Sequence, residues 1–348
     1  GYKSLCTTNF PDPTIADGST AFDAVTYTGT GSAQSITGLD FQPDFVWIKD
    51  RVNAYTHKLF DVVRGSNKVL ISDNTNAEAT ETQLLTSFNS DGFSIGNDVG
   101  LNASGANLVA WTWDAGTSTA SNTDGSITSS VRANASAGFS VVTATTPAQT
   151  SSNYSVGHGL NVPPAMWIWK HRDTASSWVV WHTSLGANRL SLNSTDAASS
   201  NDVTTPTSSV IYLPPGPTAA WNSDIVLYAF APVAGYSAFG SYTGTGTSDN
   251  SAPFVYTGFR PRWVVLKMTS DTSHWTILDT ARSAYNVTNE PLFGNLSNAE
   301  ETDAADQAID ILANGFKLRS SAGQVNENNG TYIYLAFAEH PFKTARAR

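Results

Sequence analysis

The feature that most constrains the fold of this 348-residue chain is a sequence pattern that occurs three times. Residues 41–49 read FQPDFVWIK, residues 162–170 read VPPAMWIWK, and residues 259–267 read FRPRWVVLK. Each copy has a proline, one further residue, four apolar residues and a lysine. Because adjacent apolar residues in a short run are typical of a strand buried on both faces, the pattern predicts three equivalent core strands.

The repetition continues downstream in the same order. Three further segments occur in each copy: residues 57–64 (HKLFDVVR), 178–185 (WVVWHTSL) and 275–282 (WTILDTAR); residues 68–77, 189–197 and 291–299; and the aromatic closing runs 109–113 (VAWTW), 226–230 (VLYAF) and 333–337 (IYLAF). The copies are about 100 residues apart, several times the roughly 20–50 residues of solenoid or propeller repeats. Each copy is therefore long enough to fold on its own core.

These segments predict an all-β chain of three tandem β-sandwich or jelly-roll-like units related by internal repetition. The expected boundaries are an N-terminal linker at residues 1–19, β repeats at 20–116, 135–238 and 239–343, a linker at 117–134, and a C-terminal tail at 344–348. The units are expected to follow one another like beads, with the second and third packed closely. One helical turn is compatible with the pattern, within residues 299–312.

Composition narrows the classes of partner. Charged residues make up 14% of the chain, against about 25% in ordinary globular proteins, and Ser, Thr and Asn replace them, which disfavours long helices. The net charge of −10 argues against a nucleic-acid partner, since phosphates require a clustered basic surface. No apolar run is long enough for membrane insertion. The opening residues, with two prolines, Cys6 as the single cysteine and no initiator Met, suggest a linker cut from a longer protein.

The sequence contains no recognisable catalytic constellation. Asp61 with Arg64, and Asp279 with Arg282, could each be an acid beside a charge partner, but their recurrence at equivalent places favours structural ion pairs. The six histidines have no close metal-ligand spacing, and no G-x-S-x-G motif is present. Acidic loops at residues 122–126 and 196–202 are better explained as solvated turns than as Ca²⁺ sites. We therefore expect no enzyme activity, no metal site and no cofactor.

Aromatic residues outside the repeated strands are the remaining candidates for ligand binding. Trp47, Trp111, Trp113 and Trp263 lie in repeated strands and are expected in the core. The surface candidates, all near turn residues, are Tyr55, Trp221 and Tyr285. Exposed aromatic rings can stack on sugars or anchor a protein, although local packing is the alternative role for each.

Several segments carry a resemblance to a known family. They are residues 1–15 (GYKSLCTTNFPDPTI), 41–49, 122–128 (NTDGSIT), 240–246 (GSYTGTG), 254–261 (FVYTGFRP) and 332–342. Together they resemble an uncharacterised family of three-repeat, β-rich domains found in tail-fibre and other virion proteins of tailed phages. The chain departs from the family at residues 143–146, TATT, where the second unit usually has Tyr-Thr-Gly. The family has no established catalytic residues to carry over.

The resemblance implies a location in the virion, after assembly in the host cytoplasm. We expect a structural module of a tail fibre or tail tip that contacts a host surface glycan or protein, with other virion proteins as partners and a homo-oligomer, by expectation a trimer. The alternatives are a purely architectural scaffold or decoration protein and a polysaccharide depolymerase. The last would need two facing carboxylates, and no spacing in the sequence identifies such a pair.

Overall fold

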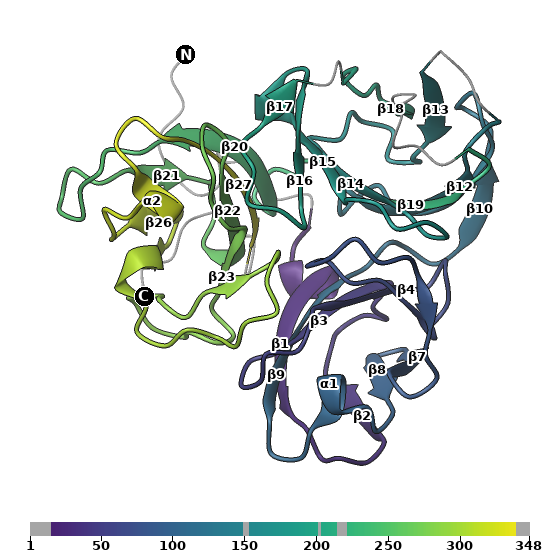
Figure 1. Ribbon diagram of the computed structural model, residues 1–348, viewed down its shortest axis with the longest axis horizontal. Helices are drawn as coiled ribbons and strands as arrows, with labels where there is room; N and C mark the ends of the chain where they lie inside the picture. The colour runs from purple at the N-terminus through teal and green to yellow at the C-terminus, as the bar shows by residue number, and fades with distance from the viewer. Residues whose placement is uncertain (1–14, 149–152, 201–202, 214–220, 339–348) are drawn as a thin grey trace.

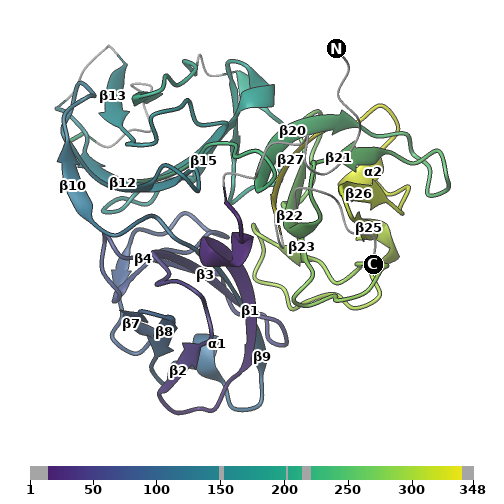
Figure 2. The same cartoon turned by 180° about the vertical axis from the view of Figure 1, so that it is seen from behind.

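The computed structural model describes residues 15–148, 153–200, 203–213 and 221–338, and nearly all of its regular structure is antiparallel β-sheet. The expected all-β class is confirmed. The strands fall into three parts of the chain: the first part (residues 18–113), the second part (119–230) and the third part (237–338). Figures 1 and 2 show these parts side by side around a common centre.

The first part has a four-stranded sheet in the order β1-β9-β3-β4 and a smaller outer sheet in the order β2-β8-β7. Its elements are η2 (Gly18–Thr20), β1 (Phe22–Thr28), β2 (Gln34–Thr37), β3 (Phe45–Asp50), β4 (Lys58–Asp61), β5 (Lys68–Val69), β6 (Ala79–Thr80), β7 (Leu85–Asn89), β8 (Gly92–Ile95), α1 (Val99–Asn102) and β9 (Asn107–Trp113). The side chain of Asp98 caps α1 by accepting a hydrogen bond from the Gly100 amide.

The second part has an eight-stranded sheet in the order β10-β11-β12-β19-β14-β15-β16-β17, and β13 pairs with β18. The elements are β10 (Thr119–Asn122), β11 (Ser129–Asn134), β12 (Phe139–Thr145), β13 (Tyr154–Gly157), β14 (Met166–His171), β15 (Val179–His182), η3 (Thr183–Leu185), β16 (Asn188–Ser191), β17 (Ser199–Ser200), β18 (Val210–Leu213) and β19 (Asp224–Phe230). Residues 117–134, expected to be a linker, thus include β10 and β11, which extend this sheet as a hairpin.

The third part has a five-stranded sheet in the order β20-β27-β22-β23-β24 and an outer sheet in the order β21-β26-β25. The elements are β20 (Ser237–Thr243), β21 (Phe254–Tyr256), β22 (Pro261–Met268), β23 (Thr276–Asp279), β24 (Leu292–Phe293), η4 (Ala305–Gln307), β25 (Ile309–Leu312), β26 (Gly315–Leu318), α2 (Gly323–Asn326) and β27 (Thr331–Ala338). The possible helix within residues 299–312 is only the single 3-10 turn η4. Ile309 and Ile311 alternate with Asp310, a period of two, and pair with β26.

The large sheets share one core. Alternate residues of β3 divide between two clusters: Phe45 and Trp47 belong to a central cluster drawn from all three parts, while Val46 and Ile48 belong to a cluster confined to the first part. The second part behaves in the same way, since Met166 and Ile168 of β14 lie in the central cluster and Trp167 and Trp169 lie in a separate one. The expectation of bead-like units with separate cores is therefore wrong. In the first two parts, strands buried on both faces have one face in a local core and the other in the common one, whereas in the third part both faces of β22 belong to the central cluster.

The centre of the molecule is densely aromatic. Trp113 from β9 packs against Phe45, Phe139 from β12 and Trp263 from β22, with ring centroids 5.3–6.2 Å apart. Such tilted and edge-to-face arrangements are the favoured geometries of aromatic pairs. Because these rings come from strands in all three parts, the sheets are held together by the same apolar contacts that bury their inner faces.

Candidate functional site

The Asp61–Arg64 pair connects the end of β4 to the second part of the chain. Both side chains are fully buried, and Arg64 donates to Asp61 through Nε and to the Leu59 carbonyl through Nη2. Tyr228 of β19 donates a 2.8 Å hydrogen bond to the Asp61 carboxylate. The pair therefore lies at the contact between the first and second parts, away from solvent.

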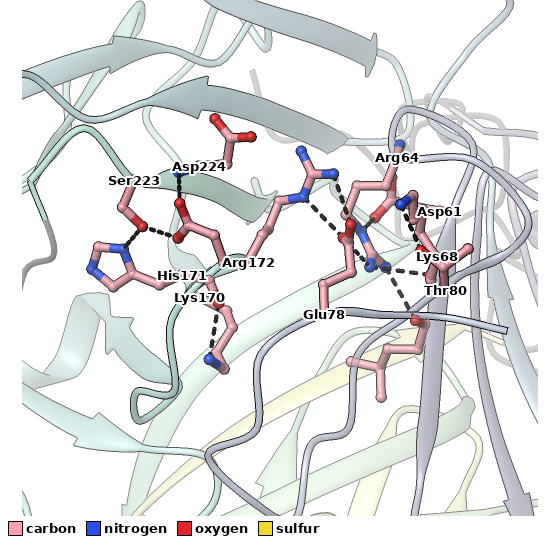
Figure 3. A network of polar contacts seen from close by, with 12 residues as sticks. Asp61, Arg64, Lys68, Glu78, Thr80, Lys170, His171, Arg172, Ser223 and Asp224 are labelled. Carbon is pink, nitrogen blue, oxygen red and sulfur yellow. Dashed lines mark hydrogen bonds and ion pairs between the residues drawn. The ribbon is translucent and has the colours of Figure 1, made fainter.

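Glu78 extends this network across the same contact, as Figure 3 shows. Its carboxylate accepts hydrogen bonds from Arg64 at 3.1 Å and from Arg172, through Nε and Nη2, at 2.9 Å each. Burial alone would raise the pKa of Glu78, but the hydrogen bonds from Arg172 and the charge of Arg64 outweigh it and hold that pKa below its usual value. Each charge in this network has a partner of opposite charge, so the network joins the first part to the second by buried ion pairs.

The contact between the third and first parts repeats this arrangement. Arg282 donates to Asp279 at 2.7 Å and to Glu300 at 2.7 Å, and Glu300 also accepts from Arg51 at 2.6–3.0 Å. Trp111 Nε1 donates to the Asp279 carboxylate at 2.9 Å, in the place that the Tyr228 hydroxyl has at Asp61. The geometry supports the structural interpretation of both Asp–Arg pairs.

The contact between the second and third parts lacks these charges. His182 and Leu185 stand where the other parts have Asp and Arg, and the neighbouring strand β27 contributes Leu335 to the central cluster. The backbone contact is kept, since the Ala198 amide donates to the Thr269 carbonyl at 2.9 Å. Burial lowers the pKa of His182 to about 4, so this histidine is neutral at pH 7.

The aromatic residues predicted as ligand contacts lie in different parts of the molecule. Tyr55, in the loop after β3, is 36% exposed and its ring lies beside α1. Trp221 is half-buried just before β19. Tyr285 is 88% exposed in the loop between β23 and β24. They do not form one site, and only Tyr285 projects freely into solvent.

The sequence interpretation missed one pair of exposed aromatic residues. Phe254 and Tyr256 on β21 are 45% and 66% exposed, while Val255 between them is buried. Phe254 is directly opposite Lys317, and Lys317 is opposite Asp310. Opposite residues of antiparallel strands point to the same face, so the three side chains form a row across the outer face of the β21-β26-β25 sheet.

In the next row of that face, the position on the middle strand has no side chain. Tyr256 is opposite Gly315, and Gly315 is opposite Leu312. A side chain at Gly315 would place its Cβ 2.0 Å from the Val255 carbonyl oxygen, so only glycine fits there. The Tyr256 ring therefore has no side chain opposite it on β26.

Tyr285 lies next to the far edge of the same sheet. Its neighbour Asn286 is fixed on β25, donating to the Ile311 carbonyl at 2.9 Å and accepting from the Ile311 amide at 2.8 Å. Val287, which follows, is 44% exposed. Exposed aromatic residues thus occur at both edges of the sheet. An Arg319–Asp310 ion pair lies between them. We define these exposed residues, Phe254, Tyr256, Tyr285 and Val287, with Asp310 and Lys317, as the aromatic face.

The corresponding sheet of the first part is polar. Ser35 on β2 is opposite Ser94, in the relationship that Phe254 has to Lys317, and their hydroxyls are 2.9 Å apart. Thr37, opposite Gly92, stands in the place of Tyr256. The same three-stranded arrangement thus forms without aromatic residues, so folding does not require them. The sequence shows two aromatic residues at i and i+2 of one strand, which places them on the same side of it, but it does not show that this side faces solvent.

Comparison with known families gives one match. The model of the family described as a domain of unknown function (DUF7483) matches residues 17–341. No curated protein matches the chain at a significant level. Within the described residues, no group of three or more His, Cys, Asp or Glu side chains is arranged to hold a metal ion, and none of the helices there is long and apolar enough to span a membrane.

Proposed function

The chain belongs to the DUF7483 family, a domain of unknown function, and from that starting point we propose that it is a structural module of a phage virion that binds a host surface glycan. Its place in a tail fibre or tail tip, its contacts with other virion proteins and its assembly as a homotrimer are parts of the same proposal. They are supported by the sequence resemblance of segments such as residues 41–49 and 254–261.

The observation that carries the binding role is the aromatic face. A sugar ring has an apolar face and a rim of hydroxyl groups, so it pairs well with an exposed aromatic ring beside charged hydrogen-bonding groups. Tyr256 and Phe254 supply rings, and Lys317, opposite Phe254, supplies a charged group on the same face, where Arg319 is held by its ion pair with the buried Asp310. A glycan fits this chemistry better than a protein partner, whose binding sites are depleted of Lys and Asp at the centre.

We also propose that the three parts are copies of one unit, closed into a ring. In each large sheet the strand order is the same: β1-β9-β3-β4, β12-β19-β14-β15 and β20-β27-β22-β23. In each case the two middle strands contain the repeated apolar and aromatic runs.

Hydrogen bonds between the parts support the ring. Trp178 Nε1 donates to the Ile71 carbonyl at 2.7 Å, and Trp275 Nε1 donates to the Ser191 carbonyl at 3.0 Å. The third bond joins His57 Nε2 to the Phe293 carbonyl at 3.0 Å. In this bond the histidine is the donor, because its Nδ1 accepts from Trp47.

The donors and acceptors occupy matching positions. Residues 57, 178 and 275 each begin the same repeated segment. Residues 71, 191 and 293 each follow the leucine that pairs with the adjacent strand. The second part thus binds the first, the third binds the second, and the first binds the third. Such a cycle supports common descent of the units and a rigid platform for the aromatic face.

The binding role is tested with the isolated chain on susceptible host cells and on a glycan array. We expect the parent to bind and the double variant Tyr256→Ala/Tyr285→Ala to lose at least tenfold in affinity. Tyr55→Ala, a change of the same kind in the first part, is the matched control and should bind like the parent.

Two outcomes would contradict the proposal. Equal binding by the double variant would show that the aromatic face is not the binding surface. No binding by the parent, together with failed particle assembly when the chain is deleted, would favour the architectural alternative. Release of oligosaccharides from host polysaccharide would instead point to a depolymerase.

A further inference from the structure

We infer that a cavity in the second part binds a single acidic sugar residue, through Arg189, His171 and Trp169. The cavity has a volume of about 260 Å³ and lies against the outer face of the β14-β15-β16 sheet, the face turned away from the common core. It is separate from the aromatic face, which is in the third part. The inference does not depend on the proposed function, since such a cavity would bind its ligand whether or not the chain contacts a host cell.

The strands bring these side chains together by register. Trp169 on β14 is opposite Val179 on β15, and Val179 is opposite Ser191 on β16. His171 and Arg189 are each two residues from a member of that row, so all of them point to the same side of the sheet. All five line the cavity.

Arg189 is a cation without a counter-charge. It is half-buried, and within the described residues its guanidinium has neither a hydrogen bond nor an ion pair. Burial lowers its pKa. A partly desolvated guanidinium is the side chain that best pairs with a carboxylate, which it binds through two parallel hydrogen bonds.

His171 presents a hydrogen-bond acceptor. Its Nδ1 is 2.8 Å from the Ser223 hydroxyl, as Figure 3 shows, and Ser223 donates its only proton to Asp173. Burial raises the pKa of Asp173, but the hydrogen bonds that its carboxylate accepts, from Ser223 and the Asp224 amide among others, together outweigh burial and hold that pKa below its usual value, so the carboxylate is charged. Ser223 therefore accepts from His171, which places the ring proton on Nδ1.

The other ring nitrogen is left free. Burial lowers the pKa of His171 to about 4, so the ring is neutral at pH 7 and Nε2 has a lone pair. Nε2 is buried and has no hydrogen-bond partner among the residues that the structure describes, and the same is true of the indole Nε1 of Trp169. Both side chains are more than nine-tenths buried. Buried polar atoms without partners are rare in folded proteins, and a ligand is one reason for them.

Counterpart positions in the other parts show that the fold does not need these groups. Judged by strand pairing, Arg189 corresponds to Val69 and Pro291, since each precedes the leucine that pairs with the adjacent strand. Trp169 corresponds to Ile48 and Leu266. The second part alone has a guanidinium and an indole where the others have aliphatic side chains.

These groups together specify the ligand class. Arg189 can pair with a carboxylate. His171 Nε2 can accept a hydrogen bond from a hydroxyl group, and Trp169 Nε1 can donate one to an oxygen atom. A sugar acid, such as a uronic acid residue, offers all three on one ring. The volume is just below the roughly 300–1,000 Å³ of pockets for drug-sized ligands, which fits one sugar residue and no longer chain.

The test is to titrate the full chain with glucuronate, glucose and acetate, and to measure binding by isothermal titration calorimetry and by saturation-transfer NMR. We expect glucuronate to bind at one site, and glucose and acetate each to bind at least tenfold more weakly. Arg189→Gln should weaken glucuronate binding at least tenfold, and Trp169→Phe, which keeps the ring but removes the donor, severalfold.

Lys68→Gln is the matched control, because it removes one cation from β5 of the first part, where the Lys68 amino group donates to the exposed Thr80 hydroxyl. It should bind glucuronate like the parent. Far-ultraviolet circular dichroism checks that each variant is folded. The inference is overturned if glucuronate does not bind, if folded Arg189→Gln binds it like the parent, or if acetate binds as tightly as glucuronate.

Discussion

The hydroxyl of Tyr228 donates to the buried carboxylate of Asp61, which is 167 residues earlier in the chain. Trp111 donates to Asp279 in the corresponding way across 168 residues. Each bond connects the aromatic closing strand of one part to the Asp–Arg pair of another. The parts are therefore joined by side chains that belong to the repeated segments themselves.

Replacing Asp61 by Asn should strongly destabilise the protein, because it leaves the Arg64 guanidinium buried with less counter-charge. Breaking a buried ion pair from one side costs about 3–5 kcal/mol, and the remaining partner Glu78 keeps the expected loss at the lower end of that range. The free energy of unfolding from urea titration measures it. The control is Asp91→Asn, an exposed substitution that introduces the residue found at the matching position 314. Its free energy of unfolding should stay within about 0.5 kcal/mol of that of the parent. Equal effects of the two changes would contradict the account.

Replacing Tyr228 by Phe removes one hydrogen bond to Asp61 and keeps the ring. We expect a loss of about 1–3 kcal/mol in the free energy of unfolding, since a buried acceptor loses a partner. Tyr212→Phe, at a half-buried tyrosine of the same part, should change it by less than about 0.5 kcal/mol. A Tyr228→Phe protein as stable as the parent would show that the bond contributes nothing.

His182 should make stability depend on pH between about 4 and 6.5. Its folded pKa of about 4 is below its unfolded value, so in this window the unfolded chain binds more protons and stability falls as the pH falls. Asp44 has the opposite slope, because burial raises its pKa to about 6.

The contribution of His182 is therefore read from a difference. From pH 6.5 to pH 4, the free energy of unfolding of the parent should fall by up to about 1.4 kcal/mol per pH unit more than that of His182→Leu. Urea midpoints at half-unit steps provide the measurement. Parallel pH profiles for the two proteins would exclude a buried neutral histidine at this position.

Gly315→Ala should disrupt the aromatic face by overpacking. The added methyl group would meet the Val255 carbonyl at 2.0 Å, so β21 would have to move away from β26, at a cost of about 1–3 kcal/mol. Gly294→Ala is the control, since its nearest contacts would be at an ordinary 3.5 Å. Hydrogen exchange of the Val255 and Phe316 amides follows the effect locally. Unchanged protection in Gly315→Ala would contradict the packing described.

The repeated strands could be predicted from the sequence because their signal is local. The run at residues 45–49 is apolar on both alternating sets, and all of β3 is buried. The pattern does not show which strands cover each face of the sheet. The same apolar runs are therefore compatible with three separate cores and with one common core. The common core depends on contacts such as Trp113 with Trp263, which have no signature in either strand alone.

The candidate sites were less predictable for a similar reason. The turn residues around Tyr285 predict that it is exposed, and its exposure is confirmed. Phe254 and Tyr256 lie in an alternating strand, where aromatic residues normally face a core, and only the pairing of β21 at the sheet edge shows that they face solvent. The cavity beside Arg189 requires three strands in register, which no single segment reveals.

The closed ring around one core is tested most directly by differential scanning calorimetry of the full chain. Because each part buries one face of its large sheet against the other two, the account predicts a single cooperative transition whose calorimetric enthalpy equals the van't Hoff enthalpy. Three resolved transitions, each matching that of a separately expressed part, would contradict it.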